Sequence, residues 1–134
     1  MEECIFCKKI KDTAPSWKVY EDEHTVAILD DANDVDGHTL VIPKKHVTNI
    51  LDCDMEAYVQ VMCSVKKVSN HYVEDCGYDG VNILSANDVS AGQSVPHFHV
   101  HIIPRKQKDG INARPTFPGA KEQKEEMYKR LSKW

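Results

Sequence analysis

The chain has 134 residues, of which 41% are hydrophobic and 28% charged, and its formal net charge at pH 7 is −4. That length suits one compact core, so we expect a single domain over residues 1–134. The acidic balance gives no general attraction to nucleic acid or to an anionic membrane surface. The apolar runs are too short to cross a bilayer, and residues 1–3 are acidic where a secretion signal would be basic. We therefore predict a cytoplasmic protein with no nucleic-acid or membrane partner.

The first third of the chain reads as a short helix followed by three strands. Residues 5–10 favour a helix, because Phe6 and Ile10 lie four positions apart. Residues 30–37 are acidic and predict a loop. The strands predicted from alternating or mostly apolar stretches, the first two as a hairpin, are residues 17–21, 25–30 and 38–43.

One long helix is predicted over residues 52–76, where apolar residues recur at spacings of three and four. The stripe expected to face the sheet consists of Met55, Tyr58, Val59, Met62, Val65, Val68 and Tyr72. A strand at residues 80–85 and a polar loop at 87–94 follow. After the last strand, residues 106–119 are basic and then proline-rich, and a final helix is predicted from about residue 120. A hairpin followed by strands around one helix indicates an α+β domain with an antiparallel sheet of about five strands.

Three histidines, His97, His99 and His101, alternate with apolar residues in the last predicted strand. Successive side chains of a strand point to opposite faces, so the three imidazoles should share one face. The residues expected on the other face, toward the core, are Phe98, Val100 and Ile102. A neutral imidazole is a nucleophile and a transient carrier of phosphoryl groups, and neighbouring imidazoles discourage one another's protonation. The row of histidines therefore indicates phosphoryl chemistry.

The loop before these histidines has features suited to phosphate. Gly92 permits close backbone approach, and Gln93 and Ser94 offer polar side chains. His38 opens another predicted strand and supplies a fourth imidazole if the two strands are neighbours.

The five cysteines form an odd set without the dense spacing of a secreted disulfide framework. Cys4 and Cys7 form a CxxC pair, which signals metal or redox chemistry in a reducing compartment. We interpret the remaining three as small buried apolar residues: Cys53, Cys63 and Cys76.

Residues 97–103 match the pattern His-φ-His-φ-His-φ-φ, in which φ is apolar, and on this motif the chain resembles the histidine-triad (HIT) family. Other stretches similar to the family are residues 28–30, 37–46 and 92–95. The resemblance covers about residues 4–105 and leaves 106–134 as a C-terminal extension. It is closest to the histidine triad nucleotide-binding, phosphoramidase branch with an amino-terminal CxxC, and it implies a HIT-like fold.

This resemblance implies a hydrolase of nucleoside phosphoramidates or nucleotidyl adducts, with a purine nucleoside 5′-monophosphate linked to an amine. His99 would attack the α-phosphorus to give a nucleotidyl-histidine, which water then hydrolyses without a catalytic metal. His101 and His38 would hold the nucleophile and carry protons. Asp30 would accept hydrogen bonds from both ribose hydroxyls, as an ionised carboxylate can. The remaining substrate contacts implied are Phe6, Ile28, Leu29, Asn87, Gln93, Ser94 and Val95.

The resemblance also implies a structural zinc ion, bound by Cys4, Cys7, His46 and His97. Two thiolates and two imidazoles make a normal tetrahedral zinc site with no open position. The alternative is two reduced cysteines without a metal.

One position departs from the family pattern, because Ala86 stands where an asparagine is common and Asn87 follows it. Either the loop shifts by one residue, or a substrate contact is missing. The alternatives to a phosphoramidase are a dinucleoside polyphosphate hydrolase, a purine-nucleotide-binding scaffold without catalysis, and a zinc-stabilised interaction module. Relatives of this branch are homodimers, so a homodimer is implied, and Trp134 is a candidate residue flanking the site.

Overall fold

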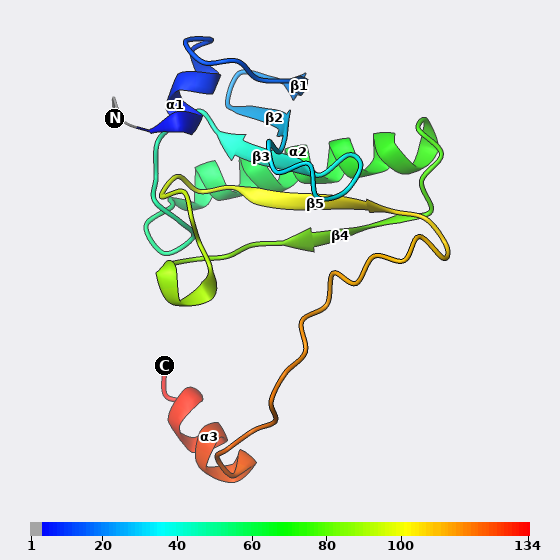
Figure 1. Ribbon diagram of the computed structural model, residues 1–134. Coiled ribbons are helices and arrows are strands. Elements are labelled where there is room, and N and C mark those ends of the chain that lie inside the picture. Colours follow the sequence, from blue (N-terminus) through cyan, green and yellow to red (C-terminus); the bar gives the residue numbers. More distant parts are fainter. Residues whose placement is uncertain (1–3) are drawn as a thin grey trace.

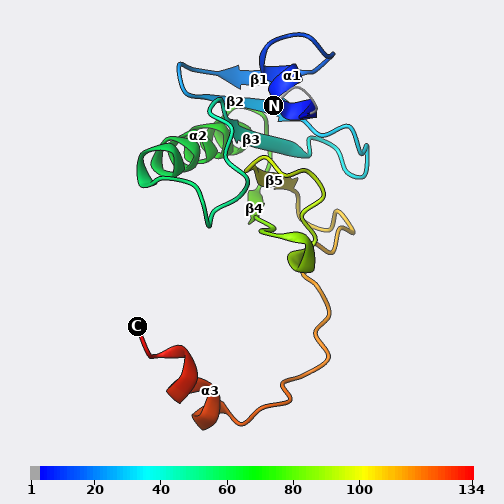
Figure 2. The same ribbon diagram turned by 90° about the vertical axis from the view of Figure 1, so that its left-hand side faces the viewer.

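The structure is a computed structural model that describes residues 4–134, so the acidic residues 1–3 lie outside the described part. In chain order the elements are α1 (Ile5–Ile10), β1 (Lys18–Glu21), β2 (Thr25–Leu29), β3 (Thr39–Pro43), α2 (Met55–Glu74), β4 (Gly80–Leu84), the 3-10 turn η1 (Val89–Ala91), β5 (Val100–Arg105) and α3 (Lys124–Leu131). The strands form one antiparallel sheet in the order β1-β2-β3-β5-β4, and α2 lies along one of its faces (Figures 1 and 2). The predicted α+β class and five-stranded antiparallel sheet are confirmed. Within the described residues, every helix is too short or too polar to cross a membrane.

Helix α2 begins after Asp54, whose carboxylate accepts a hydrogen bond from the backbone N–H of Ala57. The predicted start at residue 52 was too early, because Asp52 closes the preceding turn by accepting from the N–H groups of Thr48 and Asn49. Asp54 therefore satisfies a backbone donor in the first turn of the helix, whereas Asp52 satisfies two donors of the turn that precedes it.

The face of α2 that packs on the sheet matches the predicted stripe at five positions and departs from it at two. The five that pack on the core are Tyr58, Met62, Val65, Val68 and Tyr72. Met55 and Val59 are 71% and 50% exposed, so their predicted burial was wrong. The residues buried on this face are Ala57, Val61, Ser64, Val65, Val68 and Tyr72. The stripe is rotated because the small side chains of Ala57 and Ser64 let the helix approach the sheet closely, and a count of large apolar residues overlooks them.

Buried hydroxyl groups also connect α2 to the sheet. Ser64 Oγ lies 2.6 Å from Thr25 Oγ1 and donates to Asp22 Oδ2, and Tyr72 Oη lies 2.7 Å from Thr39 Oγ1. Burial opposes the ionisation of Asp22, but hydrogen bonds from Tyr20, His24 and Thr25 hold the pKa of this carboxyl well below its usual range. These bonds satisfy polar groups that would otherwise be costly in the core.

Two apolar clusters occupy the two faces of the sheet. The cluster under α2 includes Val41, Val61, Phe98 and Ile102, and the other, beneath α1, is built from Phe6, Val26, Ile28, Leu40 and Ile42. The second cluster covers only part of its face. The rest of that face is left to the histidines.

Residues 112–134, here called the C-terminal arm, extend away from the sheet and end in α3 (Figure 1). Helix α3 begins four residues later than predicted and ends before Trp134. No residue of α3 is buried, and its apolar side chains Tyr128 and Leu131 are exposed. The arm therefore contributes nothing to the core of its own chain.

All five cysteines are free thiols. Cys53 is partly buried, whereas Cys63 and Cys76 are exposed, so the interpretation of these last two as buried residues was wrong. Cys63 lies on the outer side of α2, and Cys76 follows the end of that helix.

The rotated stripe of α2 predicts opposite outcomes for two valines two positions apart. Val61→Ala should lower the free energy of unfolding by about 2 kcal/mol, because two buried methyl groups are lost and a cavity remains. The matched change Val59→Ala removes the same atoms from a half-exposed position and should cost less than about 0.5 kcal/mol. Urea denaturation measures both, and equal losses would contradict the observed helix orientation.

Candidate active site

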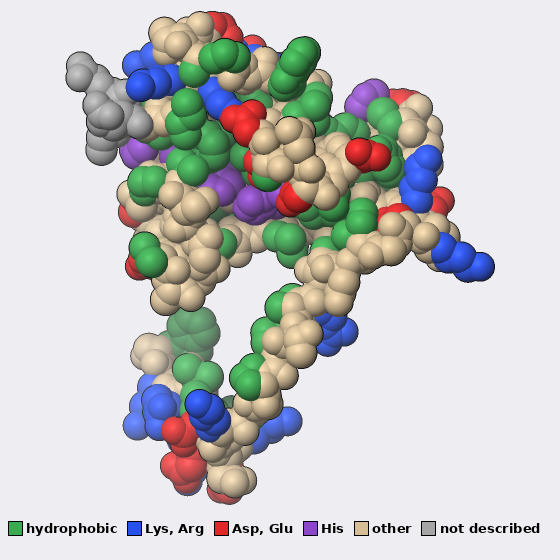
Figure 3. Space-filling view, viewed as in Figure 1, with side chains coloured by type: hydrophobic (Ala, Val, Ile, Leu, Met, Phe, Trp, Pro, Cys, Tyr) green, Lys and Arg blue, Asp and Glu red, His purple; other side chains and the backbone are tan. Residues whose placement is uncertain are grey.

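The three histidines lie on the face of the sheet opposite α2, as predicted. Figure 3 shows histidine side chains gathered across the middle of this face. The paired strand begins only at Val100, later than predicted, because the N–H of Phe98 bonds to the carbonyl of Val47 instead of a neighbouring strand. The alternation nevertheless continues upstream, since Phe98, Val100 and Ile102 are all buried in the cluster under α2.

Of the two ring nitrogens of His99, only Nδ1 makes a hydrogen bond with the described residues 4–134. Its Nδ1 lies 2.8 Å from the carbonyl oxygen of His97, which can only accept, so Nδ1 carries the proton and Nε2 has a lone pair. The ring is 6% exposed and packs edge-on against Phe6, with centroids 5.1 Å apart. Burial lowers the pKa of His99. His99 is thus a neutral imidazole whose nucleophilic nitrogen is defined by its hydrogen bond.

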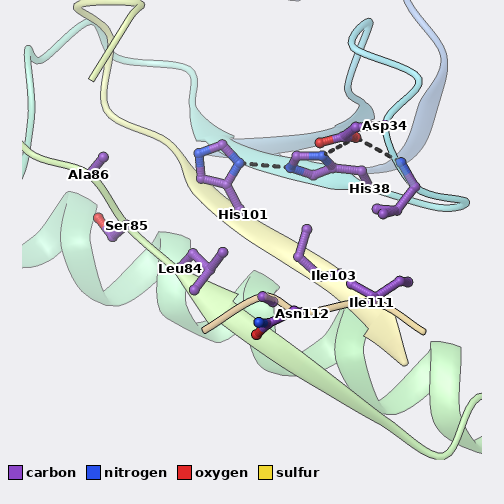
Figure 4. A pocket seen from close by; sticks show the side chains of 11 residues that line it. Asp34, His38, Leu84, Ser85, Ala86, His101, Ile103, Ile111 and Asn112 are labelled. Carbon is purple, nitrogen blue, oxygen red and sulfur yellow. Dashed lines mark hydrogen bonds and ion pairs between the residues drawn. The ribbon is translucent and has the colours of Figure 1, made fainter. Parts of the chain in front are cut away.

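A chain of hydrogen bonds runs from His101 through His38 to Asp34 (Figure 4). His101 Nδ1 lies 2.9 Å from His38 Nε2, and His38 Nδ1 lies 2.8 Å from Asp34 Oδ1. Burial, with the neighbouring His99 and His38, lowers the pKa of His101 to about 4. The Asp34 carboxylate can only accept, so His38 carries its proton on Nδ1 and has a lone pair on Nε2. That lone pair accepts a hydrogen bond from His101 Nδ1, and His101 Nε2 therefore keeps a lone pair. A proton taken up at His101 would be stabilised along this chain by Asp34.

Asp34 was not among the predicted site residues. The hydrogen bond from His38 lowers the pKa of this carboxyl, and the four-residue spacing between the two was the available signal. Asp30, predicted for the ribose, lies beside the same imidazole, with Oδ2 3.4 Å from His38 Nε2. Gly37 lies in the turn directly before His38 and has φ of +75°. A Cβ at this position would lie 3.0 Å from Pro104, so the turn requires glycine.

The loop before the histidines is held by the side chain of Gln93. Its Oε1 accepts from the N–H of Asp88 and from Asn49, and its Nε2 donates to the carbonyls of Thr48 and Val95. Asp88 has φ of +81°, which non-glycine residues rarely adopt, so the hydrogen bond that its N–H donates to Gln93 Oε1 holds a strained position. The amide of Gln93 therefore orders this loop rather than pointing into open space.

Two other polar residues of this loop, Ser94 and Asn87, differ in whether their side chains make hydrogen bonds. Ser94 Oγ makes no hydrogen bond with the described residues 4–134 and its residue is exposed. Asn87 is engaged, because its Oδ1 accepts from the N–H of Ile50 and its Nδ2 donates to Ser85. Asn87 thus does not substitute for the asparagine missing at Ala86, which favours the interpretation that one contact is absent.

The apolar residues predicted to surround the base lie at different depths. Phe6 and Ile28 are buried in the cluster beneath α1, while Leu29 and Val95 are partly exposed. Phe6 contacts the rings of both His97 and His99. Phe6 and Ile28 therefore form the floor of the site, and Leu29 and Val95 lie nearer its surface.

The four predicted zinc ligands converge, with all four donor atoms within 4.8 Å of one another. His97 Nδ1 lies 3.4 Å from Cys4 Sγ and 3.6 Å from Cys7 Sγ, and His46 Nδ1 lies 3.3 Å from Cys7 Sγ. A tetrahedron with ordinary zinc–sulfur and zinc–nitrogen bonds has sulfur–nitrogen edges of about 3.6 Å, so the donors fit this metal. Burial and the adjacent Cys4 raise the pKa of the Cys7 thiol, as expected for thiols that need a cation to ionise.

An outer hydrogen bond orients the His97 ring in this cluster. His97 Nε2 donates to the carbonyl of Pro43 at 2.9 Å, which leaves Nδ1 facing the sulfurs. Such a bond to the second nitrogen is typical of metal-binding histidines.

Two cavities flank the histidines. One of about 400 Å³ lies beside His38 and His101 and combines Asp34 with an apolar wall (Figure 4). Its lining consists of Asp34, Val35, His38, Leu84, Ser85, Ala86, His101, Ile103, Ile111, Asn112 and Ala113. The other, of about 380 Å³, is lined by Cys4, Ile5, His46, Thr48, Ser94, Val95 and Pro96. Both have the size of small-molecule sites.

Known proteins are similar in sequence to this chain over most of its length. The model of the HIT domain matches residues 11–108. Protein hit of Bacillus subtilis is 47% identical over 113 residues, covering 84% of this chain and 78% of that protein. Adenylylsulfatase HINT3 of Arabidopsis thaliana is 42% identical over 80% of this chain and 54% of its own length. Adenosine 5′-monophosphoramidase HNT1 of Saccharomyces cerevisiae is 36% identical over 81% of this chain and 66% of its own.

Solved structures share the fold. SMU.412c of Streptococcus mutans superposes with a TM-score of 0.84 at 36% identity, covering 98% of this chain and 82% of that one. A zinc-bound histidine triad family protein of Mycobacterium smegmatis superposes with a TM-score of 0.79 at 33% identity, covering 88% and 85%. Sequence and fold together place this chain in the HIT-domain family.

Proposed function

We propose that this protein hydrolyses nucleoside phosphoramidates or nucleotidyl adducts through a covalent nucleotidyl-histidine, with a purine nucleoside 5′-monophosphate as the retained group. The observation that carries the proposal is the hydrogen bond from His99 Nδ1 to His97, which leaves Nε2 of a buried, neutral imidazole unengaged. Two relatives support the substrate class, since HINT3 is named an adenylylsulfatase and HNT1 an adenosine 5′-monophosphoramidase.

In the first step, His99 Nε2 attacks the α-phosphorus, the phosphorus–nitrogen bond breaks, and the leaving amine takes up a proton. In the second, water attacks the phosphorus, gives up a proton and releases the nucleoside monophosphate with a neutral His99. We assign the proton given up by the attacking water to His101, because its Nε2 keeps a lone pair and its hydrogen-bonded chain to His38 and Asp34 stabilises the imidazolium that forms. The leaving amine of the first step takes its proton from solvent, and the proton held by His101 returns to solvent after the second step. Splitting one displacement into two is the benefit of nucleophilic catalysis.

We assign the nucleotide contacts to residues around the unengaged face of His99. Asp30 would accept the ribose hydroxyls, and Ser94 Oγ would donate to the phosphate. Leu29 and Val95 would contact the base over the floor made by Phe6 and Ile28, while Gln93 and Asn87 would act by holding the loop.

We also propose that Cys4, Cys7, His46 and His97 hold a structural zinc ion. The donor set and its spacing suit tetrahedral zinc, and four protein ligands leave no position for substrate. When bound, the ion would tie α1 to the segment before β5. We propose a cytoplasmic location, since that compartment keeps such thiols reduced and able to bind a metal.

We propose a homodimer in which the C-terminal arm packs on the second copy. Phe117 and Trp134 in the arm are exposed, and an isolated eight-residue helix such as α3 is marginal in water. The core offers apolar surface on α2 at Met55 and on the edge strand β4 at Leu84. Burying both surfaces against each other would explain why a chain keeps such an arm.

The nucleophile is tested with an adenosine phosphoramidate carrying a fluorescent amine. His99→Asn should lower kcat/KM by at least about 10³-fold, because the covalent route is lost. The matched control His24→Asn changes an exposed imidazole in the β1–β2 turn and should leave turnover unchanged. Equal turnover by wild type and His99→Asn would refute the assignment. Nucleotide binding without any turnover by the wild type would support the scaffold alternative instead.

The zinc site is tested by metal content and thermal stability. Wild-type protein from zinc-supplemented culture should hold about one zinc per chain, and a strong chelator should lower its Tm, because the metal binds only the folded state. Cys7→Ser should lose the zinc, whereas the control Cys63→Ser, on the outer face of α2, should keep it. Wild-type protein that stays metal-free and equally stable would overturn the proposal.

The dimer is tested by sedimentation velocity on the full chain. Wild type should sediment as a dimer at micromolar concentration, and Tyr128→Ser combined with Leu131→Ser should shift it toward monomer, because apolar area in α3 is lost. The control Lys121→Ser changes an exposed polar position in the same arm and should remain dimeric. A monomeric wild type would contradict the proposal.

A further inference from the structure

A second group of reactive side chains lies at the far end of α2, outside the site described above. His71 Nδ1 lies 2.7 Å from Asp75 Oδ2, and His71 Nε2 lies 3.7 Å from Cys76 Sγ. The helical spacing of four residues brings the imidazole onto the carboxylate, and Cys76 follows directly where the helix ends. The proposed nucleotide chemistry uses none of these three residues.

The hydrogen bonds define a role for each group. A carboxylate only accepts, so Asp75 fixes the proton of His71 on Nδ1 and leaves the lone pair of Nε2 toward the thiol. The S–H of Cys76 is then the donor to Nε2. A nucleophile, a base and a group that orients the base, joined in this order, are the parts of an activated nucleophile.

We propose that Cys76 is an activated thiol that exchanges with low-molecular-weight disulfides to form a mixed disulfide on the surface of the protein. In the exchange, the Cys76 proton passes to His71 Nε2 as Sγ attacks one sulfur of the disulfide. The new sulfur–sulfur bond forms, the original one breaks, and the departing thiolate takes the proton from His71. Cys76 is oxidised, one half of the disulfide is reduced to a thiol, and no other oxidant is required.

The other cysteines lack this arrangement. Cys4 and Cys7 belong to the proposed zinc site, and burial raises the pKa of the Cys53 thiol. Cys63 is exposed on the same helix as His71, but no imidazole of the described residues hydrogen bonds to it. Cys63 is therefore an internal reference for an exposed thiol without a base.

The surroundings also indicate which disulfides are preferred. Glu74, Asp75 and Asp79 lie within three positions of Cys76 in sequence, so the segment that carries the thiol is acidic. A neutral disulfide should approach more readily than an anionic one, and added salt should reduce that difference by screening.

The test follows exchange at each cysteine of the zinc-loaded full chain by mass spectrometry, with dipyridyl disulfide as a neutral probe and glutathione disulfide as an anionic one. General-base assistance is worth roughly 10²–10⁴-fold in a closed site, and on this exposed surface we expect Cys76 to react about tenfold faster than Cys63. His71→Ala should bring Cys76 to the rate of Cys63, and added imidazole should restore part of the loss.

Asp75 is tested as a positioning residue by a double-mutant cycle. Asp75→Asn should slow Cys76 in the wild-type background and have no further effect when His71 is already alanine. These side chains are exposed, so the variants should keep the wild-type Tm and phosphoramidate turnover. Equal rates at Cys63 and Cys76, or no effect of His71→Ala, would overturn the proposal whatever the outcome for nucleotide hydrolysis.

Discussion

The alternation of side chains over residues 97–102 is the constraint on which the site depends. Phe98, Val100 and Ile102 are buried under α2, so the intervening imidazoles have to lie on the opposite face. A slip of one residue would place three polar rings in the core and expose the apolar set. The packing that stabilises the sheet therefore also fixes the direction in which the histidine side chains point.

Each histidine of the row is then given its chemistry by the partner of one ring nitrogen. His97 Nε2 donates a hydrogen bond to the carbonyl of Pro43, so Nδ1 of this ring faces the sulfurs. His99 Nδ1 donates to the carbonyl of His97, so the lone pair of its Nε2 is free to attack an electrophile. His101 instead bonds to another imidazole and through it to Asp34. Burial lowers the pKa of all three rings, so they are neutral near pH 7 and these acceptors decide which nitrogen holds the proton.

Local patterns predicted the parts of this arrangement that depend on neighbours in sequence. The antiparallel α+β architecture, the existence of the long helix and the shared face of the imidazoles follow from periodicity alone. The buried face of α2 was predicted in part: Val65, Val68 and Tyr72 pack on the sheet as expected, but Met55 and Val59 are exposed and the smaller Ala57 and Ser64 are buried instead. The wall of the cavity beside His38 and His101 is built from β4, β5 and the start of the C-terminal arm. No spacing in the sequence indicates that these segments meet. The predicted zinc ligands span 93 residues, so the CxxC spacing indicated only Cys4 and Cys7, and resemblance to a family was needed for His46 and His97.

His97 connects the proposed zinc ligands to the proposed nucleophile, His99, through two parts of one residue. Its side chain lies against Cys4 and Cys7, and its backbone carbonyl accepts the bond that defines the reactive nitrogen of His99. Phe6, one residue before Cys7, packs edge-on against both rings. In the proposed zinc-bound protein, the ion would therefore hold the acceptor and the packing partner of the nucleophile without touching substrate. A structural metal placed in this way would act on the proposed catalysis through the orientation of His99, and the three histidines would then work together although each binds a different partner.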